Sequence, residues 1–368
     1  MYLKVNTKEE LVFLVQDIEK MTLSWIAIDT EFFRETTYFP VLSLIQIASQ
    51  TKVWIIDAIT CKDLTPLKSL LENKKIKKIF HAGDQDWAIL KQVTGAATWP
   101  FNDTQIMAAF AKLGHSNSLE SLVAKLLDLP LDKSQQKTDW LQRPLSLSQL
   151  EYASQDAAYV AKIYPLLDKM LTELERDSWV CEEMELLLEK YQNPNFSKDW
   201  LKLCSTGCTW PVPFYAMQLA KWREEWAKKL DLPKRHVLAD ALLEAVIKEN
   251  NLEGITQKHC LPEVYDDLVS LWGRLKDEHI NHRENEQEIM EMVKNYHQEF
   301  SVAKRKSFKK WQLKAKAIAK TLDIPAYLVL NKQQLLQLVT EKTTLSGWRK
   351  EFLKQKIPKE MPEELEVE

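Results

Sequence analysis

Acidic residues recur in this chain at spacings that could gather several carboxylates around metal ions. Asp29 and Glu31 stand two residues apart at the end of a short apolar run. Since side chains alternate along a strand, both carboxylates would face the same side of a sheet. Tyr152 and Asp156 are four residues apart in a segment with helical spacing, which places them on one helix face. Asp86 stands where a helix is expected to begin directly after a strand.

A set of carboxylates of this kind suits two divalent cations, Mg2+ or Mn2+, because both ions prefer hard oxygen ligands. Two such ions, about 3.5–4 Å apart, can activate a water molecule and stabilise the leaving oxyanion in phosphoryl transfer. A tyrosine hydroxyl, with an ordinary pKa near ~10, is a poor base and would orient the attacking water instead. From the residues alone, Asp84 remains an alternative to Asp86, and Asp156 could be an ordinary solvated helix residue.

The apolar pattern indicates the elements that must position these side chains. Three short runs at 25–29, 42–48 and 53–57 are separated by turn formers, which predicts an antiparallel meander. A fourth run at 76–80 follows a stretch with helical spacing. Strands that come first and then alternate with helices favour a mixed sheet covered by helices.

The second half of the sequence is helical almost to its end. Ser148 is expected to cap the long helix that carries Asp156, because its hydroxyl can accept a first-turn N–H. Prolines interrupt the pattern within 191–213, where we place a linker. Two helical segments follow at 214–292 and 298–357, and we divide the chain there into two further domains.

Composition excludes several classes of protein. The chain has 368 residues, of which 45% are hydrophobic and 28% charged, and this is typical of a globular protein rather than a collagen-like or disordered one. The sequence has no apolar stretch near the ~18 residues of a membrane span and no apolar leader. Its five scattered cysteines are typical of free thiols in a reducing compartment. We therefore expect a cytoplasmic protein without a membrane partner.

The net charge of -3 conceals an uneven distribution. Between 301 and 320 the sequence has eight basic residues and no acidic one, with Phe308 and Trp311 interleaved. A solvated helix face is the simpler interpretation, but basic residues interleaved with aromatics favour contact with RNA. The stretch 358–368, with five glutamates, is expected to be a disordered tail. From the basic run we select as candidate substrate contacts Lys304, Arg305, Lys309 and Lys310.

Four segments resemble, in order and spacing, the motifs of the ribonuclease D family, which are DEDD-type 3′→5′ exonucleases of the tyrosine subgroup. These segments read IDTEFFRETTYFPVLSLIQIAS, KIFHAGDQDWAIL, NDTQIMAAF and KTDWLQRPLSLSQLEYASQDAAYV. The resemblance implies that Tyr152 orients the water, and it favours Asp86 over Asp84. It also implies that Thr30 and Phe32 contact the terminal nucleotide, although core packing is an equal alternative for Phe32. The two metal ions would then be bound by Asp29, Glu31, Asp86 and Asp156.

The helical segments resemble HRDC domains, and the second copy is the more divergent. The expected fold is therefore an α/β ribonuclease H-like exonuclease domain with a mixed sheet at 1–190, followed by two all-α HRDC-like domains. The resemblance implies two-metal hydrolysis that releases nucleoside 5′-monophosphates from RNA. The implied substrates are tRNA precursors or other small structured RNAs with a 3′ overhang, and the chain is expected to be a monomer. Two alternatives are a DNA-directed exonuclease of the same superfamily and a non-catalytic RNA-binding scaffold.

Overall fold

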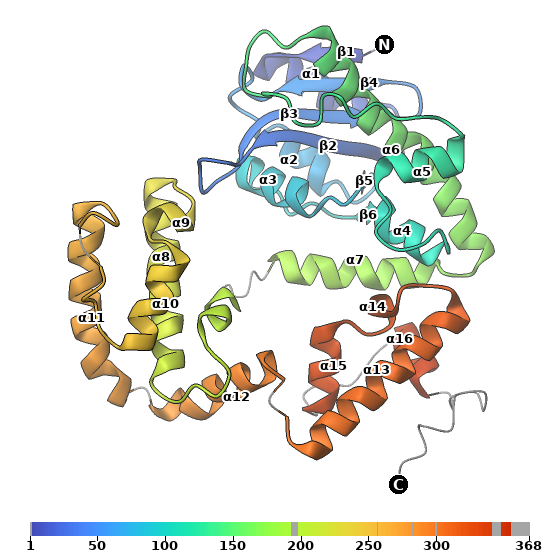
Figure 1. Cartoon of the computed structure of the whole chain (residues 1–368). Helices are drawn as coiled ribbons and strands as arrows, with labels where there is room; N and C mark the ends of the chain where they lie inside the picture. The colour runs from blue at the N-terminus through green and yellow to red at the C-terminus, as the bar shows by residue number, and fades with distance from the viewer. Residues whose placement is uncertain are drawn as a thin grey trace. The chain divides into compact units, whose positions relative to one another are not determined.

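The chain divides into two compact units in the computed structural model (Figure 1). The first unit comprises Met1–Phe33, Val41–Asn193 and Lys310–Glu368, and the second comprises Arg34–Pro40 and Pro194–Lys309. The structure describes residues 2–192, 198–255, 257–281, 283–298, 300–340 and 347–354. The predicted acidic tail at 358–368 lies outside the described residues.

A six-stranded mixed sheet forms the centre of the first unit (Figure 1). Its strands lie in the order β1-β4-β3-β2-β5-β6; β2, β3 and β4 pair antiparallel and the remaining pairs are parallel. The predicted meander and mixed sheet are thus confirmed. The edge strands β1 and β6 were not predicted, because their sequences YLKV and FND contain no continuous apolar run. The strands are β1 (Tyr2–Val5), β2 (Trp25–Phe33), β3 (Val41–Ala48), β4 (Val53–Asp57), β5 (Lys77–Phe80) and β6 (Phe101–Asp103).

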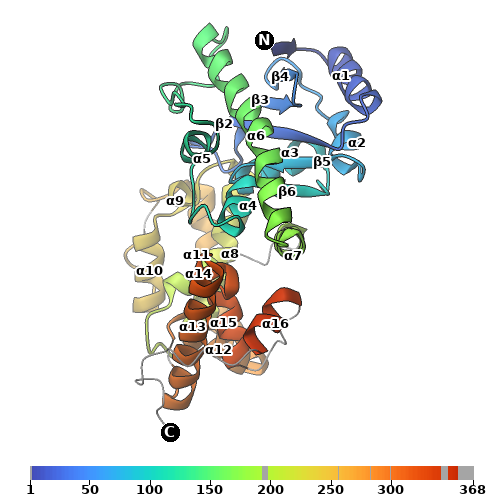
Figure 2. The same ribbon diagram turned by 90° about the vertical axis from the view of Figure 1, so that its right-hand side faces the viewer.

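Helices cover both faces of this sheet. The longest helix, α6, crosses the sheet and packs against β2, β3, β4 and β5 (Figure 2). Side chains that point away from α6, such as Ile28, Ile47 and Trp54, are also buried, so the other face is covered as well. The helices up to this point are α1 (Lys8–Lys20), α2 (Leu67–Glu72), α3 (Asp84–Thr94), α4 (Thr104–Phe110), α5 (Leu119–Leu127), α6 (Leu147–Glu173) and α7 (Asp177–Gln192).

The start of α6 differs from the expectation. Its N-cap is Ser146, not Ser148, and a reciprocal capping box joins Ser146 to Gln149. The sequence could not choose between the two serines, because each is followed three residues later by Gln or Glu. The choice comes from outside the helix. The Gln149 side-chain amide also donates to the Asp139 carbonyl at 3.1 Å and to the Thr138 hydroxyl at 3.2 Å, which ties the cap to the preceding loop.

The C-terminal helices pack with the α/β domain in the first unit, and the division of 298–357 as a separate domain stays a prediction. The rings of Trp179 in α7 and Trp348 stack with centroids 4.6 Å apart. Arg176 is buried and donates to the carbonyls of Phe110 and Leu322, each at 2.6 Å. These helices are α13 (Val302–Leu322), whose first residues belong to the second unit, α14 (Ala326–Val329), α15 (Lys332–Val339) and α16 (Gly347–Lys354).

The second unit is a helical bundle with its own apolar core. Trp200 and Leu201, which fall in the predicted linker 191–213, are buried in this core. The loop between β2 and β3 also belongs to this unit: the Tyr38 hydroxyl donates to Glu224. The elements of the bundle are η1 (Lys198–Leu203), α8 (Val212–Leu230), α9 (Lys234–Val237), α10 (Asp240–Glu249), α11 (Pro262–Asn281), η2 (Arg283–Asn285) and α12 (Glu286–Tyr296).

We predict that Trp348→Ala destabilises the first unit. Trp348 is 3% exposed and packs on α7, so its truncation should cost about 3–5 kcal/mol of unfolding free energy. Phe13→Ala is the matched control, since Phe13 is 71% exposed on α1 and its loss should change stability by less than about 0.5 kcal/mol. Denaturant unfolding and amide exchange of α7 measure both effects. Unchanged exchange of α7 in Trp348→Ala would contradict this packing.

Candidate active site

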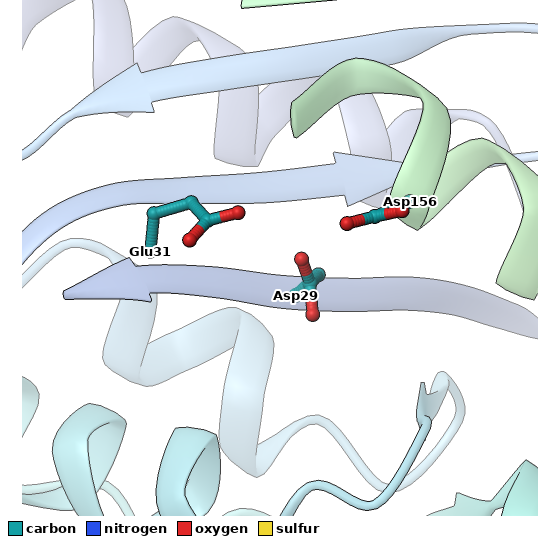
Figure 3. A group of neighbouring side chains, drawn as sticks. All are labelled: Asp29, Glu31 and Asp156. Carbon is teal, nitrogen blue, oxygen red and sulfur yellow. The ribbon is translucent and has the colours of Figure 1, made fainter. Parts of the chain in front are cut away.

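Three carboxylates converge between β2 and α6. Asp29 and Glu31 lie on the same face of β2, as the alternation of strand side chains predicted, and Asp156 reaches them from α6 (Figure 3). One carboxylate oxygen of each residue lies within 4.8 Å of the others. The position of Asp156 follows from the packing of α6 across β2. The predicted strand pair and helix acid therefore form one cluster.

The fourth acid, Asp86, lies in the first turn of α3 and is 9% exposed. Its carboxylate accepts a hydrogen bond from the Thr30 hydroxyl, between the two acids of β2. Asp86 is not one of the three residues that meet within 4.8 Å, but its charge acts on them, as described below. Asp84, the alternative, lies 3.8 Å from Lys190 Nζ in an exposed ion pair. The structure thus brings Asp86, and not Asp84, beside the cluster.

Burial perturbs the pKa values of all four acids, and repulsion from neighbouring acids of the cluster adds to its effect on Asp29 and Glu31. Burial is the largest cause in every case, and it raises the pKa of Asp29 well above its ordinary value and that of Glu31 to about 9. The charges of Asp86 and Asp156 raise both values further. The pKa values of Asp86 and Asp156 rise to about 6, and the Thr30 hydrogen bond opposes this rise for Asp86. Four crowded carboxylates cannot all ionise near neutral pH without a compensating cation.

The donor set fits divalent metal ions. Carboxylate oxygens that converge from separate elements are the ligands that Mg2+ and Mn2+ prefer, and a cation would relieve the repulsion that raises these pKa values. Asp29, Glu31 and Asp156 would hold a cation directly. Asp86 has the same chemistry and lies next to them.

Tyr152 lies one helical turn before Asp156 on α6, and its hydroxyl interacts with that carboxylate. Burial, followed by the charge of Asp156, raises the pKa of Tyr152 above its ordinary value. The hydroxyl therefore stays protonated and cannot act as a base. A fixed, protonated hydroxyl beside a carboxylate is suited to hold and orient a polar group such as water.

Sequence reasoning did not select Lys133, whose charge lowers the pKa of Asp156 against the effect of burial. Lys133 lies in the loop before α6 and pairs with Glu120 at 2.7 Å. A single lysine in a polar loop carries no periodic or motif signal. Only the folded chain brings this cation near the acids.

The residues predicted to contact the substrate lie on two elements, the strand β2 and the helix α13. Thr30 is buried, and its hydroxyl is occupied by Asp86. Phe32 is half-buried at the point where a register shift between Glu31 and Phe32 interrupts the pairing of β2 with β3. The basic residues are exposed on α13 and comprise Lys304, Arg305, Lys309 and Lys310.

Comparison with known proteins agrees with this fold. A family model described as 3′-5′ exonuclease matches residues 2–172. Ribonuclease D of Bartonella henselae is 39% identical over 230 residues, 61% of this chain and 56% of that protein. Ribonuclease D of Zymomonas mobilis is 39% identical over 222 residues, 60% of this chain and 57% of that protein. The matches thus span less than two thirds of the length of these curated relatives.

A solved structure extends the similarity along the chain. The crystal structure of Escherichia coli RNase D, described as an exoribonuclease involved in structured RNA processing, matches with a TM-score of 0.73 and 27% identity. The match covers 96% of this chain and 96% of that one. The mixed sheet and the acid cluster thus lie in a ribonuclease H-like α/β fold that is similar to 3′-5′ exonucleases over residues 2–172, and a helical region follows as in E. coli RNase D. Within this class, the resemblance of the chain to ribonuclease D is confirmed.

The raised pKa values predict a pH-dependent stability of the metal-free protein. An acid whose pKa is raised by folding stabilises the fold below its ordinary pKa near 4, and this contribution is lost as pH rises through the folded value. Thermal stability in EDTA should therefore fall as pH rises from about 4, most steeply up to about 6, where Asp86 and Asp156 become ionised, and less steeply up to about 9, where Glu31 becomes ionised. Saturating Mg2+ should raise the melting temperature more at high pH, because it binds the ionised acids.

Thermal denaturation between about pH 5 and pH 9, with EDTA or Mg2+, measures both effects. The combined variant Asp29→Asn and Glu31→Gln should show a shallower pH dependence and no Mg2+ shift. A Mg2+ shift of the same size at every pH would contradict this account of the site.

Proposed function

We propose that the chain is a 3′→5′ exoribonuclease of the ribonuclease D type, which hydrolyses phosphodiesters with two divalent metal ions and releases nucleoside 5′-monophosphates. The observation that carries the proposal is the convergence of Asp29, Glu31 and Asp156, with Asp86 beside them and the Tyr152 hydroxyl on Asp156. The similarity to ribonuclease D supports the direction of hydrolysis and the RNA substrate.

Each residue has a distinct role in this proposal. Asp29, Glu31, Asp86 and Asp156 hold the metal ions, which when bound supply charge to activate water and to stabilise the leaving oxygen. The protonated Tyr152 hydroxyl orients the attacking water, since its raised pKa excludes a role as base. Thr30 fixes Asp86 through its hydroxyl. Thr30 and Phe32 lie on the strand that carries Asp29 and Glu31, where the 3′-terminal nucleotide would be in reach of their backbone and ring.

The proposed substrates are tRNA precursors or other small structured RNAs with a 3′ overhang. The helices of 214–292 and 298–357 are proposed to be HRDC-like and to contact such RNA; the helical region shared with E. coli RNase D supports this. In the part of the chain that the structure describes, no helix could span a membrane, and Cys61, Cys181, Cys204 and Cys260 are free thiols. A cytoplasmic monomer remains our prediction.

One face of α13 is suited to an RNA backbone. Arg305, Lys309, Lys316 and Lys320 follow one another at intervals of four, seven and four residues, so they lie within a narrow arc of the helix. All four are exposed, and at 1.5 Å per residue they extend over about 22 Å. The buried positions Ala315 and Ala319 lie on a neighbouring face. We name these four residues the α13 basic stripe; Lys304 and Lys310 lie on other sides of the helix.

We predict that Asp156→Asn abolishes hydrolysis without unfolding the protein. Loss of one metal ligand should lower the rate by about 10³-fold, equivalent to roughly 4 kcal/mol of transition-state stabilisation. Since the substitution removes a charge from a repulsive cluster, the melting temperature should not fall. A timed digest of 3′-overhang RNA measures this, with free and blocked 3′ ends and with and without Mg2+.

Asp84→Asn is the matched control, because Asp84 is an exposed acid near the site and should keep full activity. Equal digestion of matched DNA would favour the DNA-directed alternative. RNA binding by the native chain without Mg2+-dependent cleavage would favour the non-catalytic scaffold.

We predict that replacing the α13 basic stripe with glutamine weakens RNA binding and its dependence on salt. Removal of four phosphate contacts to single-stranded RNA should lower the slope of log K against log[salt] by about 3. Binding of a catalytically inactive chain at several salt concentrations measures the slope. The control carries the same loss of charge at four exposed lysines of the first unit, Lys20, Lys62, Lys74 and Lys75. Equal effects in both variants would indicate a response to net charge and no RNA site on α13.

A further inference from the structure

The turn that leads into α3, and so to Asp86, has a backbone that needs external support. Ala82 in this turn has a φ of 52°, in the left-handed region that L-residues rarely adopt. A Cβ added to the next residue, Gly83, would lie 2.5 Å from the Phe80 Cβ, so only glycine fits there. The turn is therefore both strained and tightly packed. Strain of this kind persists only where surrounding contacts fix it.

Asp103 accepts hydrogen bonds from this turn and so supports its backbone, and the proposed function does not yet give this residue a role. It ends β6 as the N-cap of α4, and it is 7% exposed. Its Oδ1 accepts the N–H of Ala82 at 3.1 Å, and its Oδ2 accepts the N–H of Gly83 at 2.9 Å. The same Oδ1 accepts the N–H of Gln105 at 2.8 Å and that of Ile106 at 3.4 Å. One carboxylate thus caps α4 and holds the turn that begins α3.

The next residue, Thr104, holds the first residue of the turn. Its hydroxyl donates to the Phe80 carbonyl at 3.1 Å, and its Oγ1 lies 2.9 Å from His81 Nδ1. Because the hydroxyl proton is used on Phe80, His81 Nδ1 is the donor in the second bond. Three consecutive turn residues are therefore fixed by the two consecutive residues Asp103 and Thr104.

We infer that Asp103 is a positioning residue for the metal site. Its carboxylate fixes the turn, and the turn fixes the first residues of α3, where Asp86 meets the Thr30 hydroxyl beside the acid cluster. A carboxylate suits this position because the turn and the cap together present four N–H donors. An asparagine offers only one oxygen, and its NH2 group would face an N–H of the turn or of the cap. The inference rests on the proposed metal-dependent function.

The test is metal affinity in Asp103→Asn. We take the amide oxygen of the new asparagine side chain to replace Oδ1, so that it still accepts the N–H of Gln105 and α4 stays capped. The NH2 group then replaces Oδ2 and faces the N–H of Gly83; two donors cannot bond each other, so the turn loses this hydrogen bond. Isothermal titration calorimetry with Mg2+ and with Mn2+ should then show affinity reduced by about 10-fold or more, as for loss of a residue that orients a metal ligand. Asp103→Ser is a second variant, since serine is a preferred N-cap that preserves α4 but is too short to hold the turn.

Ser118→Ala is the matched control for loss of a cap. The Ser118 hydroxyl accepts the Ser121 N–H at 3.2 Å and caps α5, and it makes no bond to the turn. Melting temperature should fall in all three variants, whereas metal affinity should fall only in the two Asp103 variants. Native affinity in Asp103→Asn and Asp103→Ser would overturn the inference. Failure of the native chain to bind either metal would instead contradict the proposed function, so the two failures are distinguishable.

Discussion

The rest of the structure depends on the free-energy cost of placing four acids close together with little access to water. Acids forced together away from water resist ionisation, and the raised pKa values of Asp29, Glu31, Asp86 and Asp156 express that resistance. A chain gains nothing in stability from such a cluster. The scaffold must therefore hold the acids against their own repulsion until cations compensate it, and much of the first unit serves this purpose.

The scaffold holds each acid by a different device. Asp29 and Glu31 share a strand in the interior of the sheet, where β3 pairs with both residues and β5 pairs with the residues just before them. Asp156 is fixed by the packing of α6 across the strands and by the capping box that sets where α6 begins. Asp86 depends on a strained turn and on the hydroxyl of Thr30. The strained turn before α3 is thus held by side-chain hydrogen bonds, whereas β2 and α6 are held by regular secondary structure and packing.

Charge is also distributed unevenly along the chain. The four acids of the site lie in the first unit, whereas α13 has eight basic residues and no acidic one. In our proposal, this separation lets a polyanion bind on α13 and metal ions bind at the acids without mutual neutralisation. The stacked Trp179 and Trp348 and the buried Arg176 join the C-terminal helices to the α/β domain. The end of α13 is therefore part of the unit that contains the acids.

The sequence by itself determined the residue types of the site, the strands of the meander and the helical second half, because each depends on local period or on a local motif. It could not decide between Asp84 and Asp86, since both stand in the first turn of one helix and only burial separates them. It also could not choose Ser146 over Ser148, or reveal the part of Asp103, because those outcomes depend on contacts with other segments. Lys78 is fully buried, and its ammonium group donates hydrogen bonds to three backbone carbonyls. From its residue type and local sequence alone, this lysine would be expected to be exposed to solvent. Tertiary structure decided these points because burial and hydrogen-bond partners come from residues distant in the chain.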